Sequence, residues 1–457
     1  MLLCPRPFPI LLLLAICSTC SNRAADAPVS WYREITPIFK RSCNGCHNPN
    51  KLKGEVDTSS FVGFSKPGKH GPNFIVGDPA KSSVIEQISG KEPDMPKEGD
   101  PLTEPEITLV RRWIQEGAKD DTPADANSFK LKEPPVYAAH PVITALAFSP
   151  DGSLLAISGY HETFLFNAKE LTLKSRLVGE STRIESLAFS PDGKFLAISG
   201  GAPARFGEIQ VWELESGQQK HSFKITGDSL FGISWAPDSA RLAFGATDKS
   251  VRVIAASTGK ELMKFDNHSD WIFRTAWLPD GKRLLSGSRD RAMKLINAEN
   301  GQFVDDINKL LEPVVSMSRH PKEEWSAYGG AEGGVRVYRI KENQERTAAN
   351  NDVNLVREFE RHPGPVHAVA WSPDGSRLAT GSVGGEARLF NSADGKRVAT
   401  LGGHDGAVFT LAFSPDGNRI LTAGFDGLIR VFDPKDGQLM AIFTPVPIGA
   451  FKQLVQR

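Results

Sequence analysis

The sequence predicts a multidomain protein in which a small all-α domain precedes an all-β domain built from seven repeated units. Residues 28–119 carry apolar side chains at helical spacing, interrupted by Gly- and Pro-rich stretches. Across residues 136–457, a Ser-Pro-Asp-Gly turn or a close relative recurs between short alternating strands. Between the two regions, residues 120–135 are rich in Asp, Pro, Ala and Lys, which is typical of a linker.

The composition is that of a globular protein. Of 457 residues, 40% are apolar and 24% are charged, and 54 basic residues balance 54 acidic ones. This balance leaves no strongly basic footprint of the kind that binds nucleic acid, so we expect no nucleic-acid partner.

Residues 1–25 have the layout of a secretory signal peptide. Arg6 precedes an apolar run from Phe8 to Cys17, and small residues follow near Ala25, where we expect cleavage. The run is too short to span a bilayer, and no other segment reaches about 18 apolar residues, so no transmembrane segment is expected after signal removal. We therefore expect an exported protein of the periplasm or cell envelope. A lipoprotein is the alternative, because the stretch ending at Cys17 resembles an acylation site, although the bulky Ile16 fits it poorly.

The chemistry of the first domain is indicated by the motif Cys-Asn-Gly-Cys-His. After cleavage near Ala25, Cys43 and Cys46 are the only cysteines left. Two thiols at this spacing can form thioethers with both vinyl groups of one haem, and His47 can then ligate its iron. Haem is attached in this way outside the cytoplasm, which agrees with the signal peptide. The motif predicts one covalently attached haem c.

Three other interpretations of the cysteine pair are weaker. A thioredoxin-like motif would need a surrounding βαβ pattern, but the pair follows an amphipathic segment instead. A structural zinc site would need a second pair of ligands, and the nearest further histidine is His70. A plain disulfide between Cys43 and Cys46 would close a small, strained loop.

Met95 is the candidate for the second axial ligand of the iron. It is the only methionine between the haem motif and the linker, and it lies in a polar, Pro-rich loop where a core role is awkward. A thioether opposite histidine raises the haem potential and suits electron transfer. His70 is the rival ligand, and a packing or exposed role for Met95 is the remaining alternative.

Two helices should flank the haem motif. One covers residues 30–41, and the other begins at a capping box formed by Thr103 and Glu106, with proline in its first turn, and is stopped by Gly117. The apolar positions on these helices are expected to form the core, and they are Trp31, Ile35, Ile38, Phe39, Ile107, Leu109, Val110, Trp113 and Ile114.

The second domain repeats with a period of 41 to 52 residues. Its seven turns are centred on Pro150, Pro191, Pro237, Pro279, Pro321, Pro373 and Pro415. In the last unit, Val408–Phe413 alternates as a strand, a Ser-Pro-Asp-Gly turn reverses it, residues 419–423 return, and Asp426-Gly427 turns into a third strand. Three strands and an outer fourth make one blade of a β-propeller.

These repeats resemble the WD40 family over most of the second domain. No unit carries the Trp-Asp pair, and the Trp position is held by Phe166, Trp212, Ile254, Ile296, Tyr338, Phe390 and Phe432. The resemblance implies buried, structural roles for the matching polar residues, which are His140, His268, His362, His404, Asp248, Asp290 and Asp426.

Two further features of the repeats leave alternatives open. Residues 200–207 and 341–354 are longer than the repeat requires, and we interpret them as tolerated surface insertions. The outer strand that closes the ring comes either from residues 129–132 or from residues 439–443.

Residues 31–118 resemble the planctomycete-type cytochrome c domain. The resemblance is carried by Ile35 to Phe39, Cys43-x-x-Cys46-His47, Gly71-Pro72, Val76 to Pro79, Ser82 to Ile85, Met95-Pro96, Leu102-Thr103 and Trp113 to Ala118. By analogy with cytochromes c, it implies that the Pro72 carbonyl accepts a hydrogen bond from the ligating histidine. Lys97 departs from the pattern, because the family usually has a second proline there.

The sequence therefore predicts an electron carrier in which the propeller is a docking platform for a redox partner in the periplasm or cell envelope. One alternative is an oxidoreductase whose propeller binds a substrate such as a saccharide. The repeats show no paired carboxylates and no Ser-His-Asp arrangement, which counts against an enzyme. The other alternative is a scaffold with a redox-sensing haem, which would bind carbon monoxide.

Overall fold

The computed structural model describes residues 28–48, 52–97, 99–123, 134–341, 352–446 and 448. The chain divides into two compact units, Met1–Phe129 and Lys130–Arg457. The expected signal peptide, most of the expected linker and the candidate strand at residues 129–132 lie outside the described residues. Among the described residues, no helix combines the length and the apolar character needed to cross a bilayer.

The first unit consists of short helices joined by long irregular connections. The helices are η1 (Trp31–Ile35), α1 (Thr36–Ser42), η2 (Lys53–Glu55), α2 (Phe61–Phe64), η3 (Pro79–Lys81), α3 (Ser83–Ile88) and α4 (Glu104–Gln115). Both predicted helices are present. The Ser30 hydroxyl caps the first by accepting a hydrogen bond from the Arg33 backbone N–H, and the π-helical turn η1 leads directly into α1.

Helix α4 begins and ends as its sequence predicts. The Glu106 carboxylate accepts hydrogen bonds from the Thr103 backbone N–H and hydroxyl, at 2.9 and 2.8 Å, which completes the capping box. Gly117 adopts a positive φ of 103° just beyond the last turn, a conformation that favours glycine.

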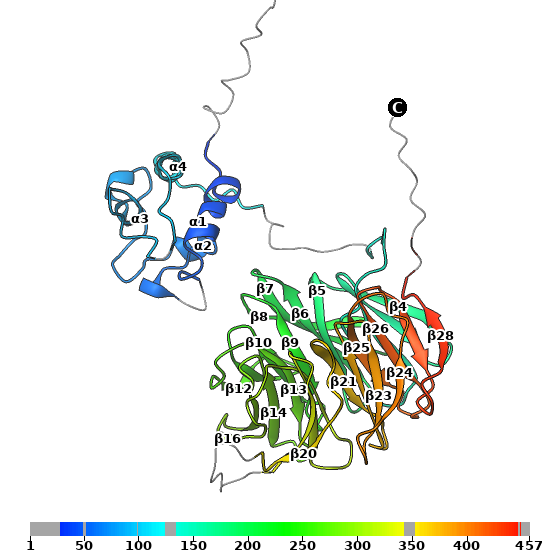
Figure 1. Ribbon diagram of the computed structural model, residues 1–457. Helices are drawn as coiled ribbons and strands as arrows, with labels where there is room; N and C mark the ends of the chain where they lie inside the picture. Colours follow the sequence, from blue (N-terminus) through cyan, green and yellow to red (C-terminus); the bar gives the residue numbers. More distant parts are fainter. Residues whose placement is uncertain are drawn as a thin grey trace, which may run out of the picture. The chain divides into compact units, whose positions relative to one another are not determined.

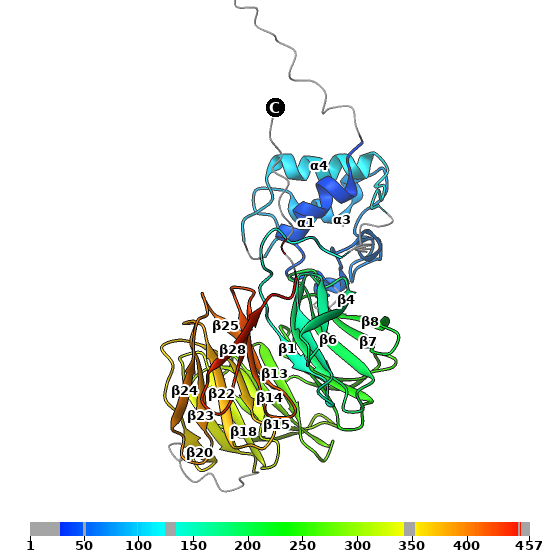
Figure 2. The same ribbon diagram turned by 90° about the vertical axis from the view of Figure 1, so that its right-hand side faces the viewer.

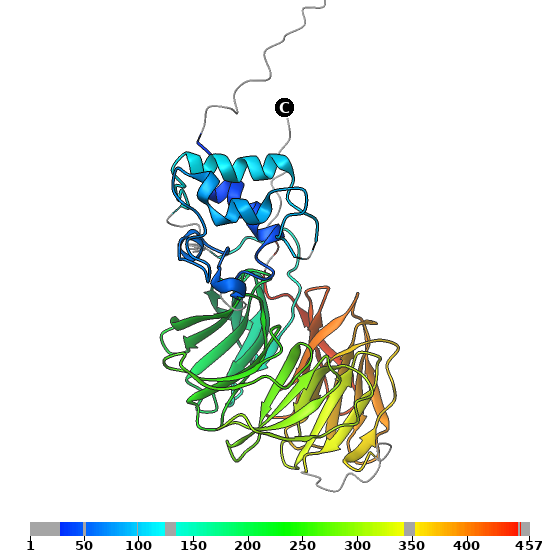
Figure 3. The same ribbon diagram turned by 90° about the vertical axis from the view of Figure 1, so that its left-hand side faces the viewer.

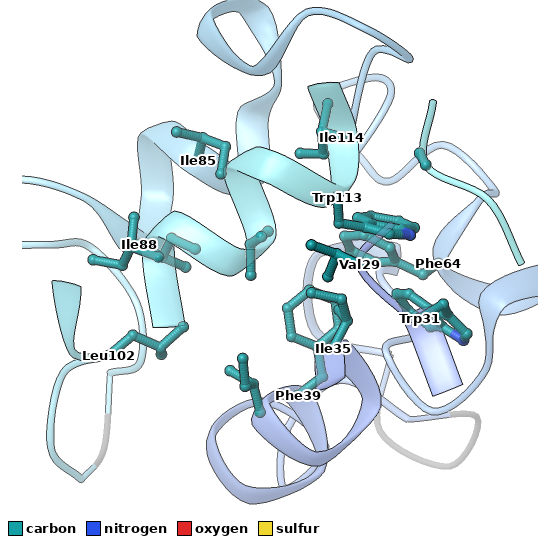
Figure 4. Close-up of a cluster of buried hydrophobic side chains, with 14 residues drawn as sticks. Val29, Trp31, Ile35, Phe39, Phe64, Ile85, Ile88, Leu102, Trp113 and Ile114 are labelled. Atoms are coloured by element: carbon teal, nitrogen blue, oxygen red, sulfur yellow. The ribbon is translucent and has the colours of Figure 1, made fainter. Parts of the chain in front are cut away.

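The core of this unit is formed where η1 and α1 cross α4 (Figure 2). The Trp31 and Trp113 ring centroids lie 5.0 Å apart, and Phe64 stacks on Trp31 (Figure 4). All the apolar positions predicted for these helices are buried except Leu109, which is partly buried against the same cluster. Large aromatic residues each bury more apolar surface than aliphatic ones, which helps so small a domain to form a core.

The second unit is a β-propeller of seven four-stranded antiparallel sheets, each made of strands consecutive in the chain (Figures 1 and 3). The first three blades are β1 (Leu146–Phe148), β2 (Leu154–Ser158), β3 (Glu162–Asn167) and β4 (Thr172–Val178); β5 (Arg183–Phe189), β6 (Phe195–Ala202), β7 (Phe206–Glu213) and β8 (Gln218–Thr226); and β9 (Leu230–Trp235), β10 (Arg241–Ala246), β11 (Val251–Ala255) and β12 (Glu261–Phe265). The next two are β13 (Ile272–Trp277), β14 (Arg283–Ser288), β15 (Met293–Asn297) and β16 (Phe303–Asp306); and β17 (Val314–Arg319), β18 (Trp325–Gly330), β19 (Val335–Arg339) and β20 (Leu355–Glu358). The last two are β21 (Val366–Trp371), β22 (Arg377–Ser382), β23 (Ala387–Asn391) and β24 (Arg397–Leu401); and β25 (Val408–Phe413), β26 (Ile420–Gly424), β27 (Ile429–Phe432) and β28 (Leu439–Phe443).

The repeated turn between the first two strands of a blade has the same internal bonds in several blades. In the last blade, the Ser414 hydroxyl donates to Asp416, whose carboxylate accepts from the Asn418 backbone N–H at 3.0 Å. Gly417 follows with a φ of 72°. The hydroxyl and the carboxylate form hydrogen bonds within the turn, and the glycine adopts the positive φ that the turn needs. The motif therefore specifies the same turn wherever it occurs.

Blade 7 closes the ring on blade 1 without sharing a strand. The outer strand of blade 7 is β28, so the structure selects residues 439–443 over the alternative at the N-terminal side. Each innermost strand contacts the next, and β25 contacts β1. The closure combines a shared apolar cluster with a hydrogen bond of 3.0 Å from the Ile143 N–H to the Gly424 carbonyl.

The insertion at residues 200–207 lengthens the central hairpin of blade 2. Strands β6 and β7 pair from Phe195–Glu213 out to Ala202–Phe206. Glycine is needed at Gly201, since a Cβ atom there would lie 2.1 Å from the Phe206 carbonyl oxygen. Most of the second insertion, residues 342–351, lies outside the described residues.

Candidate haem site

The Cys-x-x-Cys-His motif continues the helical path of α1 into one further turn. The Cys43 N–H donates to the Phe39 carbonyl at 2.8 Å. The Cys46 and His47 N–H groups both donate to the Cys43 carbonyl, at 3.1 and 3.0 Å. The two thiols and the imidazole therefore leave the chain from a single turn at the end of α1, as attachment to one haem requires.

The two cysteines are free thiols, and their surroundings differ from those of a redox-active cysteine pair. Cys43 is half-buried against the apolar core, and burial raises the pKa of its thiol to about 11 despite the nearby Arg41. Thiol-disulfide oxidoreductases need the opposite, a cysteine whose pKa is lowered. The environment thus disfavours the thioredoxin-like alternative.

His47 is oriented by a backbone carbonyl other than the one the sequence predicted. Its Nδ1 lies 2.9 Å from the carbonyl oxygen of Lys53, and Nε2 has no hydrogen-bond partner among the described residues. A histidine that ligates a metal usually donates its other ring N–H to such a carbonyl. Nε2 is therefore the atom left for a ligand.

The expectation for Pro72 is corrected by this geometry. The Pro72 carbonyl accepts a hydrogen bond of 2.9 Å from the Ser83 hydroxyl at the start of α3. The loop is fixed in this direction because the buried Asn73 amide donates to the Phe64 and Lys66 carbonyls, each at 2.9 Å. The analogy failed because η2, a short helix directly after the motif, already presents a carbonyl to His47.

Met95 and His70 occupy different surroundings. Met95 is half-buried against the same apolar cluster that Cys43 contacts, and its N–H donates to the Gln87 carbonyl at 2.9 Å. His70 is exposed, in a turn closed by hydrogen bonds between Gly68 and Gly71. The structure thus brings Met95, but not His70, against the core that borders the motif; the assignment of Met95 as iron ligand stays a prediction.

The donor set fits a haem better than a bare metal ion. Within the described ranges, no three His, Cys, Asp or Glu side chains gather where they could hold a metal ion. Zinc would require such convergence, because its ligands share one centre at about 2.0–2.3 Å. In haem c the sulfurs bond the edge of the porphyrin and only the imidazole meets the iron, so convergence is not required.

The comparison with protein families agrees with both units. Residues 43–99 match the family model of planctomycete cytochrome C, and residues 132–164, 171–202, 259–297, 353–391 and 395–433 match the WD domain, G-beta repeat. This chain combines a planctomycete cytochrome C domain with a seven-bladed WD40 propeller. No curated protein matches the chain. The cytochrome domain implies a haem c electron carrier.

The WD40 propeller contains a Ser-His-Asp arrangement that sequence reasoning missed. In blade 4, His268 Nε2 lies 2.7 Å from the Ser286 hydroxyl, and Nδ1 lies 2.8 Å from the Asp290 carboxylate. Ser286 is fully buried, so no substrate can reach it. The expectation that the repeats hold no such arrangement was wrong, because strand pairing brings together residues that are far apart in the sequence. The role of these buried residues is structural.

Other blades hold variants of this buried network. His362 bonds Thr380 at 2.8 Å, and His404 bonds Thr422 at 2.7 Å. In blade 7 an arginine, Arg430, joins the network by donating to Asp426 at 2.7 Å. The seven residues at the Trp position are all buried, as the family pattern predicts; they are Phe166, Trp212, Ile254, Ile296, Tyr338, Phe390 and Phe432.

Proposed function

We propose that this protein is an exported electron carrier in which Cys43 and Cys46 hold one haem c, His47 and Met95 ligate its iron, and the WD40 propeller is a docking platform. The observation that carries the proposal is the single helical turn that presents both thiols and the imidazole beside the core that Met95 also contacts.

Each residue has a defined role in this proposal. A c-type haem supplies a one-electron redox centre. The two thiols would anchor the group through thioether bonds, the Lys53 carbonyl keeps His47 in one ring orientation, and the Met95 thioether would be the second iron ligand. The apolar cluster that Cys43 and Met95 contact would shield that side of the group from water, which favours a high potential.

Substitution of Met95 tests the ligand assignment. We expect Met95→Ala to leave the haem attached while opening the iron and lowering its potential, because the thioether is lost. His70→Ala is the matched control, since it removes the rival ligand from an exposed turn. The measurement is the reduced and oxidised absorption spectrum with a redox titration. Unchanged values in Met95→Ala, with altered values in His70→Ala, would assign the ligand to His70.

Export and docking are further parts of the proposal. The layout of residues 1–25 and the need for haem attachment outside the cytoplasm support a mature chain that begins near Ala25. The ring of seven blades offers a rigid surface for a redox partner of the periplasm or cell envelope. Crosslinking of the exported protein in its own envelope, followed by mapping of the crosslinked residues, tests both. Crosslinks confined to the cytochrome domain would reject the docking role.

A further inference from the structure

The innermost strands of the propeller place equivalent residues around a central cavity of about 720 Å³. In each repeat, the residue six positions before the turn proline lines this cavity. Three of these residues are Phe231, Phe273 and Phe409, and the others are Thr144, Glu185, Val315 and His367. A cavity of this size with a mostly apolar lining and a few polar groups is typical of a small-ligand site.

Strand irregularity turns these side chains inward. In five blades the pairing of the innermost strand shifts register at this residue, as between Ile184 and Ser186 or between Ile272 and Arg274. A β-bulge of this kind redirects a side chain that regular pairing would send elsewhere. The seven repeats therefore place one side chain each around the cavity, and the seven residue types together determine its chemistry.

The next position of the repeat holds an anomaly. Six blades have a small residue there, and these residues are Ala145, Ser186, Gly232, Ser316, Ala368 and Thr410. Blade 4 has Arg274. The neighbouring Gly232 allows the two innermost strands to approach closely, since a Cβ atom on Gly232 would lie 2.5 Å from the Arg274 Cα, whatever the side chain at position 274. The fold of the repeat does not require an arginine here, because six of the seven units do without one.

The guanidinium of Arg274 is short of partners. Its one hydrogen bond to a described residue runs from Nη1 to the carbonyl of Phe273, at 3.1 Å, although a guanidinium has five N–H donors. No carboxylate of the described residues lies within ion-pair distance of it. Burial lowers its pKa, although Glu185 opposes that effect. Arg274 is half-buried, and a partly desolvated cation that makes no ion pair is costly in free energy, a cost that a bound anion would relieve.

The other polar groups of the cavity restrict which anion fits. The Glu185 carboxylate is paired at 3.2 Å with Arg183 and also interacts electrostatically with Arg274. Burial, together with the charge of Arg274, lowers the pKa of His367 to about 4, so the imidazole is neutral at pH 7. One free guanidinium beside a carboxylate accommodates a single negative charge better than a phosphate dianion.

We infer that this cavity binds a small monoanionic carboxylate with an apolar, preferably aromatic, body. The planar fork of Arg274 matches a carboxylate through two parallel hydrogen bonds. The three phenylalanines of the ring receive the apolar body, and their edges favour offset or edge-to-face contact with an aromatic ring. The inference concerns residues of the propeller alone and goes beyond the electron-carrier proposal.

Calorimetric titration of the full-length, haem-loaded protein with biphenyl-4-carboxylate tests the inference, with biphenyl-4-carboxamide as the neutral probe. We expect the carboxylate to bind and the carboxamide to bind at least about tenfold more weakly. Arg274→Gln should lower the carboxylate affinity by about 10- to 100-fold. Arg274→Lys should restore part of it, because the charge returns without the fork.

Arg319→Gln is the matched control. Arg319 ends an innermost strand, and among the described residues its side chain likewise bonds only a neighbouring carbonyl, at 2.8 Å to His320, but it does not line the cavity. We expect this variant to bind like the wild type. Equal binding of the two probes, no binding of the carboxylate, or an unchanged affinity in Arg274→Gln would overturn the inference. Unfolding curves and the haem spectrum verify that each variant is folded, and they report on the electron-carrier proposal separately.

Discussion

The cytochrome domain and the WD40 propeller differ in how the sequence places their candidate functional residues. In the cytochrome domain the chemistry is carried by a contiguous motif, Cys43 to His47, at the end of one helix. In the propeller the repeated motifs specify structure, as in the turn around Asp416, and the pair of His268 with Asp290 is structural as well. The propeller's candidate chemistry lies where one repeat departs from the others, at Arg274. A repeat protein is thus best searched for function at its exceptions.

Loss of both cysteines should affect the cytochrome domain strongly and leave the propeller unchanged. Cys43→Ser combined with Cys46→Ser should abolish covalent haem binding completely, because both thioether anchors are lost. The propeller, which is a compact unit of its own, should unfold at the same temperature as in the wild type. Differential scanning calorimetry with a haem stain of a denaturing gel measures both. Haem that stays covalently bound in the double variant would contradict the assignment.

Replacement of one buried phenylalanine in each domain shows whether the two domains unfold independently. Phe39 in the cytochrome domain and Phe390 in the propeller are both fully buried. Each change to alanine should cost about 3–5 kcal/mol of unfolding free energy through lost burial and a residual cavity. Calorimetry should show each variant shifting only its own transition, and the smaller domain by more degrees. Shifts of both transitions in one variant would mean that the domains unfold as one cooperative unit.

The propeller should lose stability in mildly acidic solution. Burial, reinforced by the positive charge of Arg388, lowers the pKa of His362 to about 4, from an ordinary value of 6.5. Since the unfolded chain then binds more protons than the folded one between these values, stability falls as the pH drops from 6.5 toward 4. The loss from this one histidine should be about 2 kcal/mol between pH 7 and pH 5.

Urea unfolding of the wild type and of His362→Gln at both pH values measures this loss. The variant should show a smaller difference between pH 7 and pH 5. His221→Gln, on the outer strand β8, is the control and should keep the wild-type difference. A pH dependence that is the same in all three proteins would exclude His362 as its source.

The smallest expected effect concerns an ion pair at the surface of the cytochrome domain. Arg41 Nη2 lies 2.6 Å from the Glu106 carboxylate, but the arginine side chain is 60% exposed. Arg41→Met should therefore cost only about 0.2–1 kcal/mol, less at high salt. Urea unfolding at low and high salt measures it. A cost above the range for exposed pairs would show that Arg41 holds α1 against α4 more firmly than its exposure suggests.

Much of the fold could be predicted because its signals are local. The capping box of Thr103 and Glu106, the glycine after α4 and the repeated turns each satisfy their requirements within a few residues, so sequence spacing is sufficient. The carbonyl partner of His47 could not be predicted, since it depends on how η2 folds back on the motif.

The buried network of blade 4 escaped prediction for a related reason. Ser286 and Asp290 lie 18 and 22 residues from His268 and meet it only through strand pairing. The cavity residues were missed although a signal was present, because Arg274 interrupts a column of small residues that appears only when the repeats are aligned on their turn prolines. Such a column indicates a position, and the structure was needed to show that the position faces a cavity.

Intact mass spectrometry of the exported, denatured protein after thiol alkylation shows whether one haem is bonded through both cysteines. We expect a single species whose mass is that of the mature chain plus one haem, with no alkylated cysteine, since Cys43 and Cys46 are the only thiols after Ala25. A species of the bare chain mass carrying two alkyl groups, recovered from cells with a working haem-attachment system, would contradict it.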